Sequence, residues 1–296
     1  MAMALAPNAE NRLLEELYNR KIKLGAADDR KCQLVLKKVL EVVLGTGKEK
    51  SPHFKELFKE IYYTGSYYDQ LKVNSSDFEF DLNIVFRFPK ETLWCLTHIG
   101  DDVRKPNFGH LQTTKHPHSG AWNSLLIKDS QGNLVVSPKR MFEVLKTAVD
   151  RALTAVNNTC DVNNERYRVT RSDGAPVILN VYGPGVKFTI DLVPSFKLEL
   201  HDLQTGCSDL KERVVNILKE FNIYVNTCMA IALKNASRDR FEIDFHDIER
   251  GLLNKSGGCV YKVIKLMKYL RDTKGGNIAK LWSHLLKVIY NRSIIF

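Results

Sequence analysis

The chain has 296 residues, of which 44% are hydrophobic and 26% are charged, a balance typical of a folded protein rather than a disordered one. No apolar run approaches the roughly 20 residues that a membrane helix requires, and the first residues lack the basic start and long apolar stretch of a secretory signal. The net charge of +10 favours a polyanionic partner, although a basic surface without such a partner would give the same charge.

The cysteines and histidines form no recognisable zinc pattern. Six cysteines lie far apart without a CxxC pair, which favours reduced thiols in a protein of the cytosol or nucleus rather than a disulfide framework. The polar stretch 99–120 has no clear period and is expected to be a loop. Its histidines, His110, His116 and His118, lack a fourth ligand at metal-site spacing, so we expect solvated loop residues rather than metal ligands.

The predicted elements begin and end with helices around a strand-rich centre. Ser-Pro pairs at residues 51 and 137 each supply an N-cap followed by a proline in the first turn, which predicts two helix starts. Apolar spacing and these signals predict helices at 8–25, 31–44, from 52 onward, and at 138–157, 208–222, 224–235, 245–254, 258–273 and 277–290. Strands are predicted at 78–86, 177–182 and 186–193, with a hairpin within 122–136. This order predicts two lobes packed together.

One predicted strand carries two carboxylates on the same face. From Phe78 to Phe86 apolar residues alternate with polar ones, so Glu79 and Asp81 point to one side, roughly 7 Å apart. A second alternating strand, "VKFTIDLV", adds Asp191. Solvated polar faces are common on antiparallel strands. Carboxylates, however, are poor strand formers and repel one another, which makes a cation site the more attractive interpretation.

Three carboxylates suit a pair of magnesium or manganese ions, because hard cations prefer oxygen ligands. Coordination positions that the carboxylates leave free can bind water or phosphate. Such a site can activate an attacking hydroxyl and stabilise a departing pyrophosphate. Gly65 and Ser66 precede the acidic pair by a short distance. Glycine allows close approach of the backbone, and a serine hydroxyl with nearby amides can hold phosphate oxygens.

At this point the sequence shows a family resemblance. "GSYYDQLKVNSSDFEFDLNIVF", "FTIDLVPSF" and "FHDIERGLLNKSGGCVYKVIKLMKYLRD" are similar to the cyclic GMP–AMP synthase (cGAS) family, including the cGAS-like receptors of insects, and the likeness runs from about residue 10 to about residue 290. The resemblance implies an α/β (α+β) class and a bilobal nucleotidyltransferase with a central twisted mixed sheet. It places the N-terminal helices and core in residues 1–200 and a helical lobe, apparently truncated, in residues 201–296.

The family pattern implies that Glu79, Asp81 and Asp191 hold two magnesium or manganese ions and carry the catalysis, without zinc. It assigns nucleotide contacts to Gly65, Ser66, Glu249, Lys268, Ser283 and His284. For Lys268 the alternative is a solvated helix face, with Val263 in the apolar stripe of that helix.

The sequence departs from the family in three places. Vertebrate cGAS carries a zinc-binding insertion where this chain has only "CVYKVI", which argues against a zinc-dependent DNA sensor. Glu242 stands where vertebrate cGAS has a base-contacting arginine, and Arg240 could substitute for it. The chain ends at "NRSIIF", where family members continue for several more helices, so the resemblance implies an incomplete helical lobe.

The resemblance therefore implies a cytoplasmic enzyme of innate immunity that makes a cyclic dinucleotide from ATP and GTP when it binds double-stranded RNA. It allows a homo-oligomer on nucleic acid and implies no membrane partner. The nucleic-acid contacts are expected from the basic residues of the first helices, Arg20, Lys23, Lys31, Lys37 and Lys38, with a solvated face as the alternative. The rival functions are a template-independent synthase of linear oligonucleotides and an inactive nucleic-acid-binding module.

Overall fold

The computed structural model describes residues 12, 15–22, 26–72, 78–87, 94–98, 108–113, 120–173, 176–200, 208–232, 240–255 and 258–274. Its helical elements are η1 (Tyr18–Ile22, a π-helix), α2 (Ala26–Lys50), α3 (Pro52–Leu57), α4 (Gly65–Tyr68), α5 (Gly120–Asn123), α6 (Pro138–Ala155), α7 (Ser208–Glu220), α8 (His246–Lys255) and α9 (Gly258–Lys274). Its strands are β1 (Phe58–Thr64), β2 (Phe78–Phe86), β3 (Trp94–His98), β4 (Phe108–Thr113), β5 (Leu126–Lys128), β6 (Leu134–Val136), β7 (Thr159–Val162), β8 (Glu165–Ser172), β9 (Val177–Gly183), β10 (Val186–Glu199), β11 (Thr227–Ala232) and β12 (Phe241–Asp244).

These strands form one mixed sheet. Its main path runs β5-β6-β4-β12-β11-β10-β9-β8-β7, and β2 joins it through β10, β1 through β2, and β3 through β4. β2 and β10 run parallel, whereas the other strand pairs are antiparallel. β10 is the central strand, because its first half pairs with both β9 and β2 and its last residues pair with β11.

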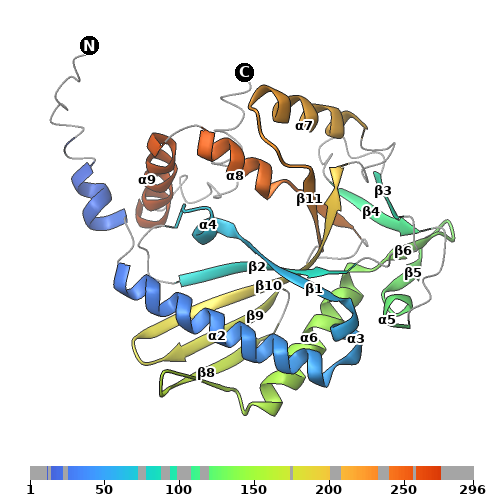
Figure 1. Cartoon of the computed structure of the whole chain (residues 1–296), viewed down its shortest axis with the longest axis horizontal. Coiled ribbons are helices and arrows are strands. Elements are labelled where there is room, and N and C mark those ends of the chain that lie inside the picture. Colours follow the sequence, from blue (N-terminus) through green and yellow to red (C-terminus); the bar gives the residue numbers. More distant parts are fainter. Residues whose placement is uncertain are drawn as a thin grey trace.

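Helices lie on both sides of the central strands. Figure 1 shows α2 and α6 below the strands β2 and β10, and α7, α8 and α9 above them. The core fills the space between the sheet and the pair α2–α6, which also contact each other. Val35, Val39 and Val43 follow one another at i, i+4 spacing on α2 and are each at most 1% exposed, so this helix packs through one continuous apolar stripe.

Several sequence predictions are confirmed. The strand 78–86 is found with the predicted bounds, and its residues Phe80, Leu82 and Ile84 are fully buried. Ser51 and Ser137 cap α3 and α6, where their side chains accept hydrogen bonds from the amides of Phe54 and Arg140. The hairpin of β5 and β6 is present, as are the helices α7, α8 and α9, and the predicted α/β class with a mixed sheet is correct.

Other predictions are wrong. The apolar run expected as a helix at 224–235 forms β11, because a short apolar run fits a buried strand as well as a helix. Part of the loop expected at 99–120 forms β4, which includes His110, while His116 and His118 lie outside the described residues. The helix expected at 277–290 also lies outside them. The predicted division at residue 200 stays a prediction.

No helix among the described segments is long and apolar enough to cross a membrane. Cys32, Cys160 and Cys228 are buried free thiols, and burial raises the pKa of the Cys160 thiol above its ordinary value.

The core predicts a large effect for one aromatic residue. Phe196 on β10 is fully buried and stacks on Trp122 with ring centroids 5.6 Å apart, and its ring also contacts Phe86 and Phe241. We expect Phe196→Ala to lower the free energy of unfolding by about 3–5 kcal/mol in urea denaturation, because a large cavity replaces the ring. Tyr224→Ala is the control, since Tyr224 is 95% exposed and its loss should change stability by less than about 0.5 kcal/mol.

Candidate active site

The parallel pairing of β2 with β10 brings the three predicted carboxylates together. Asp81 lies opposite Asp191 in the register, and Glu79 lies opposite Thr189, so all three acidic side chains leave the same face of the sheet. One carboxylate oxygen from each of Glu79, Asp81 and Asp191 lies within 4.8 Å of the others. Because like charges at this spacing repel, the arrangement favours a bound cation.

The backbone of the Gly-Ser turn lies directly against this cluster. β1 pairs with β2 so that Thr64, its last residue, lies opposite Asp81, and Gly65 follows at once. Gly65 has φ +77°, and a Cβ atom at this position would lie 1.9 Å from Oδ2 of Asp81. Only glycine allows both this conformation and this approach. Ser66 is partly buried in the same turn, at the start of α4.

These residues fit a divalent cation. The donor set is three carboxylates, which are the ligands that magnesium and manganese prefer. Further polar groups line the same face of the sheet: Thr64 Oγ1, Asn83 Nδ2 and Ser195 Oγ are buried and have no hydrogen-bond partner within the described part of the chain. Such groups require hydrogen bonds from water or a polar ligand, so this face is suited to a hydrated ion and a polar substrate.

Helix α8 covers part of this face and brings further polar residues to it. The Tyr62 hydroxyl on β1 donates to Asp247 Oδ1 at 2.5 Å, and burial followed by this hydrogen bond raises the pKa of Tyr62. Glu249, one of the predicted nucleotide contacts, lies on the same helix and is partly buried. His246 Nδ1 lies 3.1 Å from Asp244 Oδ1 at the start of the helix. The contacts of Tyr62 with Asp247 and with the ring of His246 thus hold the start of α8 over the carboxylate face of the sheet.

Lys268 on α9 is 4% exposed and lies on the same helix face as Val260 and Ile264. The alternative of a solvated face is therefore wrong for this lysine. Val263, expected in the apolar stripe, is 59% exposed and does not belong to it. The nucleotide contact expected for Lys268 stays a prediction.

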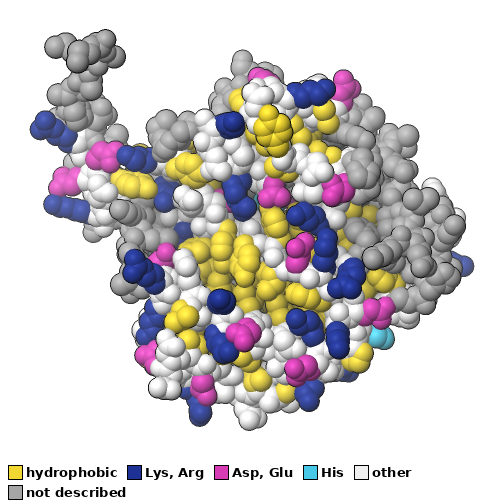
Figure 2. All heavy atoms as spheres, viewed as in Figure 1, with side chains coloured by type: hydrophobic (Ala, Val, Ile, Leu, Met, Phe, Trp, Pro, Cys, Tyr) yellow, Lys and Arg dark blue, Asp and Glu magenta, His cyan; other side chains and the backbone are white. Residues whose placement is uncertain are grey.

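The predicted nucleic-acid residues are partly neutralised by acidic neighbours. Arg20 pairs with Glu16 at 2.8 Å, Lys31 with Glu165 at 3.0 Å, and Lys38 with Glu41 at 3.2 Å. Lys37 is exposed on α2. Figure 2 shows Lys and Arg side chains spread around a central group of apolar side chains, with acidic residues between them. Lys23, Ser283 and His284 lie outside the described residues.

Two contacts near the Gly-Ser turn have no signal in the sequence. Arg250 on α8 donates to Asp69 Oδ1 at 3.1 Å, and the Tyr67 hydroxyl donates to Asp29 on α2. Asp69 is only 3% exposed, so its ion pair with Arg250 is largely removed from water. Both contacts join residues that are distant along the chain, and no local spacing or motif could have indicated them.

The close contact at Gly65 gives a testable prediction. Gly65→Ala should weaken Mn²⁺ affinity by at least about tenfold in calorimetric titration, because its Cβ must displace the Asp81 carboxylate from the cluster. Gly132→Ala is a matched control: Gly132 also has a positive φ, +84°, but no atom lies within 4 Å of its added Cβ. Equal Mn²⁺ affinity in the two variants would contradict the assigned role of Gly65.

Comparison with known proteins gives an independent result. The family described as "Mab-21 protein nucleotidyltransferase domain" matches residues 67–255. A "Cyclic GMP-AMP synthase-like receptor" of Nicrophorus vespilloides is 25% identical over 282 residues, which cover 92% of this chain and 71% of that protein. Proteins of the same name from Microplitis demolitor and Aethina tumida are 25% and 22% identical over 292 and 295 residues.

These matches cover 92% and 96% of this chain, but only 51% of the Microplitis protein and 70% of the Aethina protein. The family match includes Asp81 and Asp191 and extends over more than half of the chain. The chain therefore belongs to the Mab-21 nucleotidyltransferase family and is similar over most of its length to cyclic GMP-AMP synthase-like receptors.

Proposed function

We propose that this nucleotidyltransferase joins ATP and GTP into a cyclic dinucleotide when it binds double-stranded RNA. The observation that carries the proposal is the cluster of Glu79, Asp81 and Asp191 beside the backbone of Gly65. The names of the similar proteins support the product class, since they are called cyclic GMP-AMP synthase-like receptors. Such a receptor would act in the cytoplasm, where a long RNA could bind several copies of the chain.

The three carboxylates would hold two magnesium or manganese ions, whose charge lowers the pKa of the attacking hydroxyl and stabilises the departing pyrophosphate. A ribose hydroxyl of one nucleotide then attacks the α-phosphorus of the other. A phosphodiester bond forms, pyrophosphate leaves, and the hydroxyl proton passes to solvent. A second transfer between the joined nucleotides closes the ring and releases another pyrophosphate.

The other residues of the site would bind and orient the two nucleotides. Ser66 and Lys268 would hold the triphosphate, while Glu249, Ser283 and His284 would contact sugar or base. Orientation matters because well-aligned reactants avoid much of the entropic barrier of a bimolecular reaction. The proposal includes no zinc ion. The ligands of the site are carboxylate oxygens, which suit the harder cations magnesium and manganese.

The central test is the product. Purified protein is incubated with labelled ATP, GTP and magnesium, with and without double-stranded RNA or DNA, and the products are resolved after phosphatase treatment. We expect a phosphatase-resistant product that requires RNA. It should fall by at least about a thousandfold in Asp81→Asn, because one ligand of the catalytic ions is lost.

Asp161→Asn on β7 is the matched control. Asp161 is an exposed acidic residue that pairs with Arg166, away from the carboxylate cluster. A phosphatase-sensitive ladder of products would instead support a linear oligonucleotide synthase. No product with any ligand, from protein with a cooperative unfolding transition, would support the inactive binding module.

The RNA contact is tested by charge reversal. We expect Lys31→Glu and Lys37→Glu each to weaken RNA binding, and neutralisation of each phosphate contact should reduce the salt dependence of log K by about one unit. Lys139→Glu is the control, since Lys139 is exposed on α6. Unchanged binding and unchanged RNA-stimulated turnover in both α2 variants would exclude this helix as the RNA site.

A further inference from the structure

The short helix α4 contacts both faces of β2. Gly65 at its start lies against Asp81 on the carboxylate face, as described above. Two residues later, the ring of Tyr67 packs edge-on against Phe80, with ring centroids 4.7 Å apart. Phe80 stands between Glu79 and Asp81 in the chain and points to the opposite, buried face. The position of Tyr67 therefore determines how the Gly-Ser turn lies against the carboxylates.

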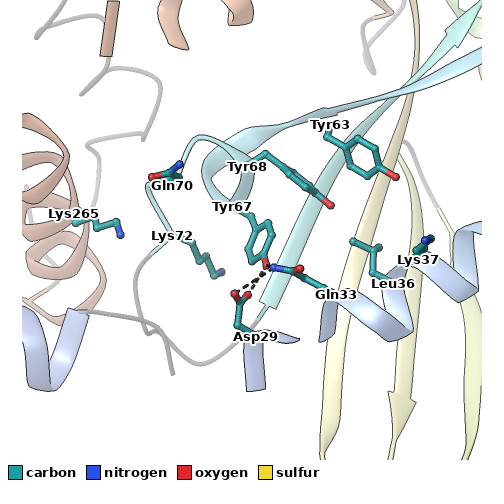
Figure 3. Close-up of a pocket in the computed structure, with 10 residues that line it drawn as sticks. All are labelled: Asp29, Gln33, Leu36, Lys37, Tyr63, Tyr67, Tyr68, Gln70, Lys72 and Lys265. Carbon is teal, nitrogen blue, oxygen red and sulfur yellow. Dashed lines mark hydrogen bonds between the residues drawn. The ribbon is translucent and has the colours of Figure 1, made fainter. Parts of the chain in front are cut away.

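The hydroxyl of Tyr67 is bound to α2. It donates a hydrogen bond to Oδ1 of Asp29, and Nε2 of Gln33 donates to the Tyr67 oxygen at 2.5 Å and to Asp29 Oδ2 at 3.3 Å (Figure 3). Asp29 and Gln33 lie one helical turn apart, so α2 offers both groups on one face. Burial, and after it the bond to Asp29, raise the pKa of Tyr67 above its ordinary value, so the hydroxyl stays a donor well above neutral pH.

Packing alone does not hold α4 on this side. A cavity of about 540 Å³ opens beside Tyr67, between α2, α4 and α9 (Figure 3). Its lining includes Tyr63, Tyr67, Tyr68, Lys37, Lys72 and Lys265. Because the described side chains leave this space open, a shift of α4 toward α9 meets less steric resistance than a shift into a filled core. The hydrogen bonds to Asp29 and Gln33 add to the packing of Tyr67 on Phe80 in opposing such a shift.

On its other side α4 is tied to α8. Asp69, the C-cap residue of α4, accepts hydrogen bonds from Nε and a terminal nitrogen of Arg250, and Arg250 also donates to the carbonyl oxygen of Tyr63 at 3.3 Å. The turn is thus held between two helices from distant parts of the chain. Loss of one tie leaves the other, so the turn would become displaced without unfolding of the protein.

We propose that Tyr67 is a positioning residue, whose hydroxyl, bound to Asp29 and Gln33 of α2, fixes the Gly-Ser turn against the carboxylates so that the turn can hold a nucleotide. This inference rests on the proposed role of Gly65 and Ser66 in nucleotide binding. It adds a function to α2 that is separate from its basic surface, since Asp29 is acidic and Gln33 is neutral.

Amide hydrogen exchange tests the proposal without any nucleotide. The amides of Asp69, Gln70 and Leu71 donate to the carbonyl oxygens of Gly65, Tyr67 and Ser66, so their exchange reports local opening of the turn. In Tyr67→Phe the ring remains but the hydroxyl is lost. We expect these three amides to exchange about fivefold faster, as for the loss of one hydrogen bond, while the amides of β9 and β10 stay unchanged.

Three further variants separate the hydrogen bond from general effects. Asp29→Leu removes the acceptor and should match Tyr67→Phe, and the double variant should be no worse than either. Asp29→Asn keeps an oxygen acceptor, so the three amides should exchange as slowly as in the wild-type chain. Tyr68→Phe removes the neighbouring hydroxyl, which makes no hydrogen bond within the described segments, and should leave exchange unchanged.

Turnover supplies a second readout. Tyr67→Phe should raise KM for ATP about fivefold and change kcat less than about twofold, because the turn binds ground state and transition state alike. Unchanged exchange at the three amides, or faster exchange throughout the chain, overturns the proposal. If the wild-type chain makes no product, the proposed function fails, whereas the exchange result still decides whether Tyr67 positions the turn.

Discussion

The repulsion between carboxylates on β2 and β10 is the constraint around which this structure is organised. Parallel pairing sets Asp81 directly beside Asp191, and two like charges in neighbouring positions destabilise a sheet unless a counter-charge is present. Everything near the cluster accommodates it. The adjoining turn carries glycine where a side chain would strike Asp81, and polar groups such as Asn83 replace apolar ones on the same face. A site arranged in this way is suited to bind cations together with a phosphorylated substrate.

Helix α2 connects this site to the core. Its valine stripe anchors it against the sheet and α6, which fixes the positions of its other faces. Asp29 and Gln33 near its start reach the turn, and Lys31 and Lys37 lie in the same stretch of the helix. Because the core face of α2 is tightly packed, the helix cannot shift easily, and its polar side chains keep fixed positions relative to the turn.

The two strands that carry the carboxylates could be predicted from the sequence because apolar and polar residues alternate along most of their length. From Phe78 to Ile84, and from Phe188 to Leu192, apolar residues alternate with polar ones, and a period of two is a strong signal. β1 carries no such pattern, since the consecutive residues Lys59 and Glu60 are both exposed and the next two are both half-buried, and β11 is an apolar run that also fits a helix. The contacts Tyr67–Asp29 and Arg250–Asp69 depend on tertiary packing, which no local pattern encodes.

The pairing of β2 with β10 also affects the order in which the chain folds. Parallel neighbours cannot be joined by a tight turn, and here the strands β3 to β9 and the helices α5 and α6 lie between them along the chain. Closing so long a loop costs conformational entropy, which slows the step, so contacts of this kind form late in folding. A partly folded chain could have its hairpins and capped helices in place and still lack a metal site. The nucleotidyltransferase site would then be completed only with the finished sheet.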